Sequence, residues 1–171
     1  PPVEDEHALK HYRLLQEKAV EAGYDNYEFS NFSKPGYYSQ NNMAYWEGRS
    51  YLGIGPGAHG YDQKKRCWNI SNNILYAKAI EEGELPLECE ELNDIDRYNE
   101  YVLTRLRTAK GLSLSTLKAN FGEGLYAYAM QEAQPHIDAK RLEVDGDFMF
   151  ITAYGRFQND GISGDLFYIE D

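Results

Sequence analysis

The sequence predicts an α+β fold whose organisation changes near residue 90. Two stretches, residues 3–22 and 94–110, carry apolar residues at helical spacing. Shorter runs bounded by glycine and proline indicate strands, and Asp145-Gly146 is a hairpin turn signal. No internal repeat or low-complexity tract is present, so we expect ordinary globular packing.

The first half is expected to alternate between helix and strand. In order, the sequence predicts a helix over 3–22, a strand over 24–32, a short buried strand over 51–55, a strand over 66–70 and a helix from Asn72 or Asn73 to Gly83. Residues 37–46 show no clear periodicity. Residues 84–93 form an acidic run that contains Pro86, and they are the candidate linker.

The second half is expected to hold helices followed by a hairpin. A helix over 94–110 would bury Ile95, Tyr98, Val102, Leu103 and Leu106. A short helix capped by Ser113 would end at Gly122, and a third from near Leu125 would be kinked or broken at Pro135. Residues 142–152 form the hairpin, and a last helix carries Phe157, Ile162 and Leu166. This order is winged-helix-like.

The charge of the chain argues against several classes of partner. Twenty-eight acidic residues against 17 basic ones give a net charge of −11, which repels phosphate backbones and anionic lipid. We therefore expect no nucleic-acid partner. No long apolar run predicts a transmembrane helix, and no signal peptide is visible, so a cytoplasmic protein is expected. The chain opens on Pro1-Pro2 without an initiator Met, which is typical of a fragment or a processed product.

Three short patterns match functional motifs only in part. His7 and His11 have the spacing of two metal ligands on a helix, but no glutamate lies between them, so a solvated helix face is expected. Residues 55–60 match the dinucleotide fingerprint, yet no helix follows directly. Cys67 and Cys89 have no metal-type spacing, and we expect two reduced thiols.

Three segments read together resemble one family. They are residues 22–36, the Asn-Met-Ala-Tyr-Trp sequence at 42–46, and residues 51–59, which contain Gly-Pro-Gly-Ala-His. They are similar to the oxygen-independent coproporphyrinogen III oxidase family, and most like its HemW-type heme-chaperone branch. Trp68-Asn69, Gly83 and residues 155–167 fit the same C-terminal region, so the resemblance spans essentially the whole chain.

The resemblance implies a radical S-adenosylmethionine protein. In such a protein an N-terminal Cys-x3-Cys-x2-Cys motif holds a [4Fe–4S] cluster, whose fourth iron site binds S-adenosylmethionine. This chain lacks the motif. By resemblance, residues 1–90 would be the end of a partial radical-SAM (β/α) barrel and residues 91–171 a winged-helix-like domain with a β-hairpin.

The resemblance also implies two sets of site residues. Gly55, Gly57 and Ala58 would be main-chain neighbours of S-adenosylmethionine. The family motif His-Asn-x-x-Tyr-Trp, associated with heme binding, aligns with residues 41–46, so Asn42, Tyr45 and Trp46 would line a heme or porphyrin. Asn41 stands where the family has His, and asparagine is a poor iron ligand. Tyr45 and Trp46 are equally compatible with a place in the core.

Three functions remain open from the sequence. The parent would either deliver heme to an acceptor protein as a chaperone, or oxidatively decarboxylate coproporphyrinogen III. Few basic residues lie near residues 41–46 in the sequence, which favours the chaperone, because porphyrin propionates would attract them. A non-catalytic winged-helix interaction module is the third reading, and it predicts that residues from about Glu91 onward fold alone.

Overall fold

The hydrophobic core lies in the second half of the chain. The computed structural model describes residues 5–170, so the predicted start of the first helix at Val3 lies outside the described residues. Here α4 (Asp94–Leu106), α5 (Leu114–Asp138) and α6 (Asn159–Asp165) pack with a sheet of order β6-β8-β7, formed by Leu112–Ser113, Phe148–Ile151 and Leu142–Asp145. The residues of the core cluster run from Tyr98 to Leu166. A short 3₁₀ turn, η1 (Arg156–Gln158), precedes α6.

Helix α4 packs one face into the hydrophobic core. Tyr98, Val102 and Leu106 are buried in the core, at spacings of four residues. The prediction is confirmed for these three, whereas Leu103 is 37% exposed. A capping box between Asn93 and Asp96 begins the helix, which fixes its N-terminal end.

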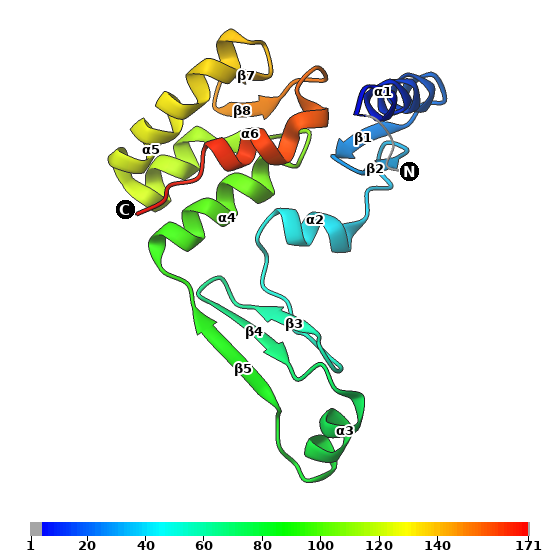
Figure 1. Ribbon diagram of the computed structural model, residues 1–171, viewed down its shortest axis with the longest axis vertical. Helices are drawn as coiled ribbons and strands as arrows, with labels where there is room; N and C mark the ends of the chain where they lie inside the picture. The colour runs from blue at the N-terminus through cyan, green and yellow to red at the C-terminus, as the bar shows by residue number, and fades with distance from the viewer. Residues whose placement is uncertain (1–4, 171) are drawn as a thin grey trace.

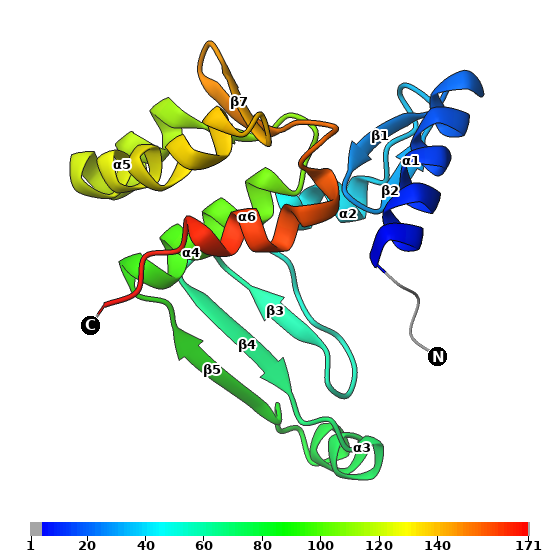
Figure 2. The ribbon, with the colours of Figure 1, turned by 45° about the horizontal axis from the view of Figure 1, so that its top comes forward.

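The first half of the chain forms two smaller units around α2 (Gln40–Trp46) (Figure 1). In one of them, α1 (Asp5–Glu21) lies on a hairpin of β1 (Asp25–Glu28) and β2 (Asn31–Ser33). In the other, the strands β3 (His59–Tyr61), β4 (Lys65–Asn69) and β5 (Leu87–Glu91) form an antiparallel sheet. Helix α3 (Asn73–Glu81) lies in the chain segment that connects β4 to β5. Figure 2 shows this sheet and α3 projecting away from the core as an arm.

Several predicted elements differ from the observed ones. The strand over 24–32 is a hairpin, because residues 29–30 turn the chain, and residues 37–46 contain α2. Residues 51–55 form no strand, and only an isolated bridge joins Tyr51 to Tyr61. The candidate linker contains β5, which pairs with β4 along its whole length. The helix after Asn72 is confirmed.

The long helix α5 is interrupted at Gly122 and not at Pro135. Gly122 has φ 83° and ψ 175°, which separates the chain into two helical segments there, as predicted. The predicted break at Pro135 is wrong, since the helix continues to Asp138. A proline removes only one N–H donor, and the buried residues Ala133 and His136 hold this turn against the core.

Cys67 and Cys89 are not free thiols. They lie directly opposite each other on β4 and β5, with their Cα atoms 4.1 Å apart, and a disulfide joins them. The prediction of two reduced thiols is therefore wrong for this structure. Sequence spacing does not reveal this disulfide, because the two cysteines meet only when β5 pairs with β4, and the sequence predicts a linker in place of β5.

Candidate functional site

The predicted heme-binding residues lie on α2. Ser39 caps this helix by accepting a hydrogen bond from the Asn42 backbone N–H at 3.3 Å. Asn42, Tyr45 and Trp46 follow at spacings of three and four residues, which place them on one face of the helix. Tyr45 is 42% exposed, and Trp46 is half-buried. Neither belongs to the hydrophobic core cluster.

Tyr45 and Trp46 open onto a pocket of about 370 Å³, here called the aromatic pocket. It lies between the end of α2, the β3–β4 strands, α4 and the first segment of α5. Six aromatic side chains line it, namely Tyr45, Trp46, Tyr51, Tyr61, Tyr101 and Phe121. Tyr45 packs edge-on against Tyr51 at 4.5 Å between ring centroids, and Tyr101 contacts Phe121 at 5.6 Å. Asn42 does not line this pocket.

Three arginines line the aromatic pocket as well. Arg66 comes from β4, while Arg97 and Arg105 come from α4. The two α4 arginines and Tyr101 each precede a core residue of the same helix, so successive turns of α4 serve both the core and the pocket. The argument from sparse local basic residues is therefore wrong, because the fold brings the charges from 20 to 60 positions further along the chain.

Three tyrosines of the pocket, Tyr51, Tyr61 and Tyr101, are partly buried by the surrounding residues. Burial raises the pKa of Tyr51, Tyr61 and Tyr101 above the usual value of 10.0. Their phenols therefore keep their protons at neutral pH. Tyr101 donates its proton to the carbonyl of Ser113 at 3.1 Å, which fixes the ring on the pocket wall. The pocket thus presents apolar ring faces together with cationic arginines.

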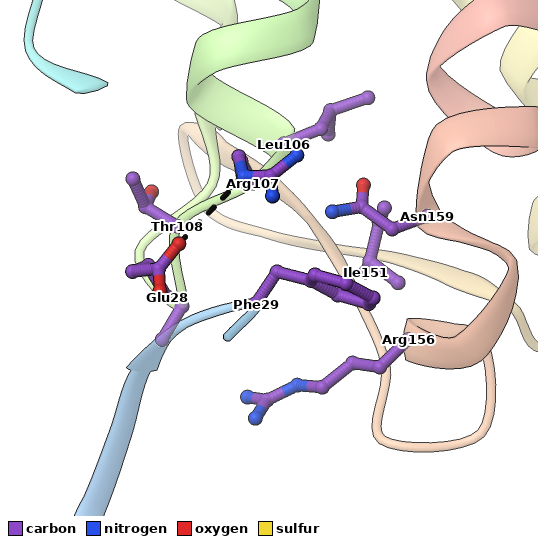
Figure 3. A pocket seen from close by; sticks show the side chains of 9 residues that line it. Glu28, Phe29, Leu106, Arg107, Thr108, Ile151, Arg156 and Asn159 are labelled. Carbon is purple, nitrogen blue, oxygen red and sulfur yellow. Dashed lines mark ion pairs between the residues drawn. The ribbon is translucent and has the colours of Figure 1, made fainter. Parts of the chain in front are cut away.

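A partly buried ion pair packs against the ring of Trp46. The Arg107 guanidinium lies 4.9 Å from the Trp46 ring centroid and 5.3 Å from that of Phe29. Its Nε is 3.7 Å from Oε2 of Glu28, whose side chain is fully buried. A cavity of about 10 Å³, about the size of one water probe, lies beside this pair (Figure 3). Glu28 and Arg107 gave no signal in the sequence, because 79 positions separate them.

Three polar atoms around this ion pair lack hydrogen-bond partners among the described residues. They are Oε2 of Glu28, Nε of Arg107 and Nε1 of Trp46, and all three are buried. Oε1 of Glu28 is fully used, since it accepts from Ser30 and Asn31. Unpaired buried polar atoms are costly, and the adjoining cavity is large enough for one water that could bond to Glu28 and Arg107.

The predicted S-adenosylmethionine residues lie elsewhere, in the loop between Tyr51 and β3. The Gly55 N–H donates to the Tyr76 hydroxyl at 3.2 Å, the Gly57 N–H to the Ile70 carbonyl at 3.0 Å, and the Ala58 N–H to the Gly55 carbonyl at 3.2 Å. Hydrogen bonds within the arm therefore satisfy all three N–H groups. None of the three residues lines the aromatic pocket, so the structure does not bring the two predicted sets together.

Apolar side chains beside this loop are strongly exposed. Leu52 is 83% and Ile54 81% exposed, and the neighbouring α3 has Ile74 at 80%. Helix α3 contributes no buried residue. Exposed apolar residues gathered in this way are typical of a surface that another part of a protein covers.

A wider groove of about 1,490 Å³ lies between α1, the β1–β2 hairpin and the loops around residues 109 and 154. Four tyrosines line it, at positions 24, 27, 38 and 154. Its three basic residues face three acidic ones, so its charge is balanced, whereas the aromatic pocket has three arginines and two glutamates. The aromatic pocket is therefore the better site for an anion.

Two kinds of feature are absent from residues 5–170. None of the helices there is both long enough and apolar enough to span a bilayer. No group of three or more His, Cys, Asp or Glu residues in this range is arranged to hold a metal ion.

Comparison with known proteins identifies close relatives in sequence. The HemN C-terminal domain family matches residues 92–157. The heme chaperone HemW of Mycobacterium tuberculosis is 32% identical over 160 residues, which are 92% of this chain and 39% of that protein. HemW of Bacillus subtilis is 32% identical over 126 residues, and the match covers 73% of this chain and 33% of that HemW protein.

A solved structure shares the fold. It is coproporphyrinogen III oxidase (HemN) from Escherichia coli, described as a radical SAM enzyme, with a TM-score of 0.68 and 19% identity. The match covers 90% of this chain and 40% of that one, so the chain spans between a third and two fifths of the length of these three proteins. The chain belongs to the HemN and HemW family and corresponds to the part of these proteins that carries the HemN C-terminal domain.

Proposed function

We propose that this chain is the C-terminal part of a cytoplasmic radical S-adenosylmethionine protein that binds a tetrapyrrole and acts as a heme chaperone. The observation that carries the proposal is the aromatic pocket, in which Tyr45 and Trp46 meet three arginines. Planar apolar rings stack well on aromatic side chains, and arginines bind carboxylates, so the lining suits a porphyrin with propionates. The names of the relatives at 32% identity support the chaperone reading.

The [4Fe–4S] cluster of such a protein does not fit the residues of this chain. A cluster of this kind is held by closely spaced thiolates, and the only two cysteines here, Cys67 and Cys89, are joined to each other. We therefore assign the cluster to other parts of the parent protein.

The loop of Gly55, Gly57 and Ala58 is proposed to lie against S-adenosylmethionine in the parent. Its N–H groups are already bonded, so its contribution would be close main-chain packing, which small residues permit. The exposed Leu52 and Ile54 support the proposal that residues 1–90 complete a partial barrel whose other strands cover this side.

Residues 91–171 are proposed to form a winged-helix-like domain. The order helix, strand, two helical segments and hairpin supports this, as does the sheet order β6-β8-β7. The second segment of α5 has no lysine or arginine, so a role in protein contacts, including contact with a heme-acceptor protein, suits it better than DNA binding.

Decarboxylation of coproporphyrinogen III is the second candidate function. The three arginines favour it, because that substrate carries more carboxylates than heme. Formation of 5′-deoxyadenosine by the full-length parent, tested with and without coproporphyrinogen III, would separate the enzyme from the chaperone.

A heme titration of the chain, followed by absorbance, tests the proposed site. We expect a saturable Soret shift, weakened about 2- to 10-fold in Tyr45→Ala, since an aromatic contact contributes about 0.5–1.5 kcal/mol. Tyr37→Ala is the matched control, because Tyr37 is 80% exposed and lies outside the pocket. Absence of a saturable shift in the folded chain would remove the heme site from this part of the protein.

A further inference from the structure

Arg105 is the arginine of the aromatic pocket whose charge is not neutralised by an acid. Arg66 forms ion pairs with Glu90 and Glu100, and Arg97 pairs with Asp94 at 3.2 Å. Among the described residues no carboxylate oxygen lies within ion-pair distance of Arg105, although acidic residues outnumber basic ones 28 to 17 in the chain. A cation without an acid partner is ready to bind an anion.

Contacts on two sides hold the Arg105 guanidinium in place. One Nη donates to the carbonyl of Glu47 at 2.6 Å, just after the end of α2. The guanidinium carbon lies 5.4 Å from the centroid of Tyr101, the ring that Ser113 fixes. A guanidinium has five N–H donors and keeps its charge at any physiological pH, so most of its donors remain available.

We propose that Arg105 binds a carboxylate of a planar aromatic ligand held in the aromatic pocket. The inference rests on the proposed function and adds to it the residue, Arg105, that would bind the acid groups of the ligand. Arginine matches a carboxylate with two parallel hydrogen bonds, which gives direction as well as charge. The pocket therefore selects ligands with free acid groups over neutral ligands of the same shape.

The size of the pocket agrees with binding at one edge of the ligand. Its volume of about 370 Å³ lies near the lower end of the range of about 300–1,000 Å³ for small-molecule sites. A tetrapyrrole would thus enter by one edge, and the edge with the acid side chains meets Arg105. Arg97 can take a second carboxylate, because its present partner Asp94 is 84% exposed and such pairs are weak.

If Arg105 had a purely structural role, its loss would affect ligand binding in a different way. By bonding to the Glu47 carbonyl, Arg105 also ties α2 to α4 and so helps to place Tyr45 and Trp46. If that were its only role, its loss would weaken every planar ligand equally. A pair of ligands that differ only in their acid groups separates the two roles.

The test compares protoporphyrin IX with its dimethyl ester, by quenching of tryptophan fluorescence in the chain. We expect Arg105→Met to weaken binding of the free acid about 10- to 100-fold, since a charged hydrogen bond to the ligand is lost, and to weaken the ester far less, through loss of the Glu47 contact alone. Arg105→Lys keeps the positive charge but cannot form two parallel hydrogen bonds to a carboxylate. Its affinity for the free acid should lie between those of the unaltered chain and Arg105→Met. Arg13→Met, on α1 and outside the pocket, is the control.

The outcomes separate this inference from the proposed function. An equal loss for both ligands in a variant with an unchanged unfolding midpoint would overturn the carboxylate role. Equal affinity of the unaltered chain for both ligands would overturn it too, while the pocket itself would stand. If the folded chain binds neither ligand, the proposed function fails at this site and the inference fails with it.

Discussion

Trp46 illustrates how much a single residue depends on partners that the sequence does not reveal. The resemblance pointed to Tyr45 and Trp46, and the structure places both on the aromatic pocket. Their partners Arg66, Arg97 and Arg105 carry no local motif, because only the folded chain brings β4 and α4 to α2. The partly buried pair of Glu28 and Arg107 was invisible for the same reason.

Gly111 and Gly124 should respond in opposite ways to the same substitution. A Cβ at Gly111 would lie 2.2 Å from the Met149 carbonyl oxygen, and its φ is +80°. Gly111→Ala should therefore lower the free energy of unfolding by more than about 2 kcal/mol. Gly124 is exposed in α5, and a Cβ added there would meet no other atom within 4 Å. Gly124→Ala should therefore raise the free energy of unfolding by about 0.5–1 kcal/mol.

Urea unfolding of the two glycine variants beside the unaltered chain measures both effects. A destabilised Gly124→Ala variant, or a Gly111→Ala variant as stable as the parent, would contradict the backbone described here.

At the scale of elements, the helices of the second half could be predicted, whereas α2 and β5 in the first half could not. Helix α4 repeats its apolar residues over 13 positions, which gives a clear periodic signal. Helix α2 has seven residues and no buried one, so its aromatic and polar sequence shows no stripe. Strand β5 is exposed at every position, and only its pairing with β4 makes it a strand.

The disulfide of Cys67 and Cys89 should fasten β5 to the sheet. The two cysteines are 22 positions apart, and closing a loop of that size stabilises by roughly 3 kcal/mol. Alkylation of air-purified, denatured protein should find no free thiol, and after reduction it should find two. Reduction, or the Cys67→Ser and Cys89→Ser double variant, should speed proteolysis of residues 70–87.

Two alkylated thiols in the unreduced protein would contradict the pairing. Gly124→Ala serves as a control for the proteolysis, since it changes stability in the other half of the chain.

For the whole molecule, the structure concentrates stability in residues from α4 onward. Every member of the core cluster comes from this half, and Tyr27 is the buried apolar residue that the earlier part contributes. The sequence predicted a change near residue 90 from composition. It could not predict the arm, whose sheet forms from strands with few apolar residues.

Limited digestion with trypsin should cut the chain within the arm first. Lys78 lies on α3, its side chain is 69% exposed, and α3 has no buried residue, so cleavage there is expected early. After reduction of the Cys67–Cys89 disulfide, the first stable product should contain residues 79–171, identified by mass spectrometry. Products that begin within α4 would contradict a core in this half.

Helix α4 carries two stripes that differ by one position. Arg97, Tyr101 and Arg105 face the aromatic pocket, and each is followed directly by a core residue. One inserted or deleted residue turns the rest of a helix by about 100°, which would displace both stripes together. Substitutions at the pocket positions can therefore change the pocket and leave the core in place, whereas a change in the length of α4 would disturb both at once.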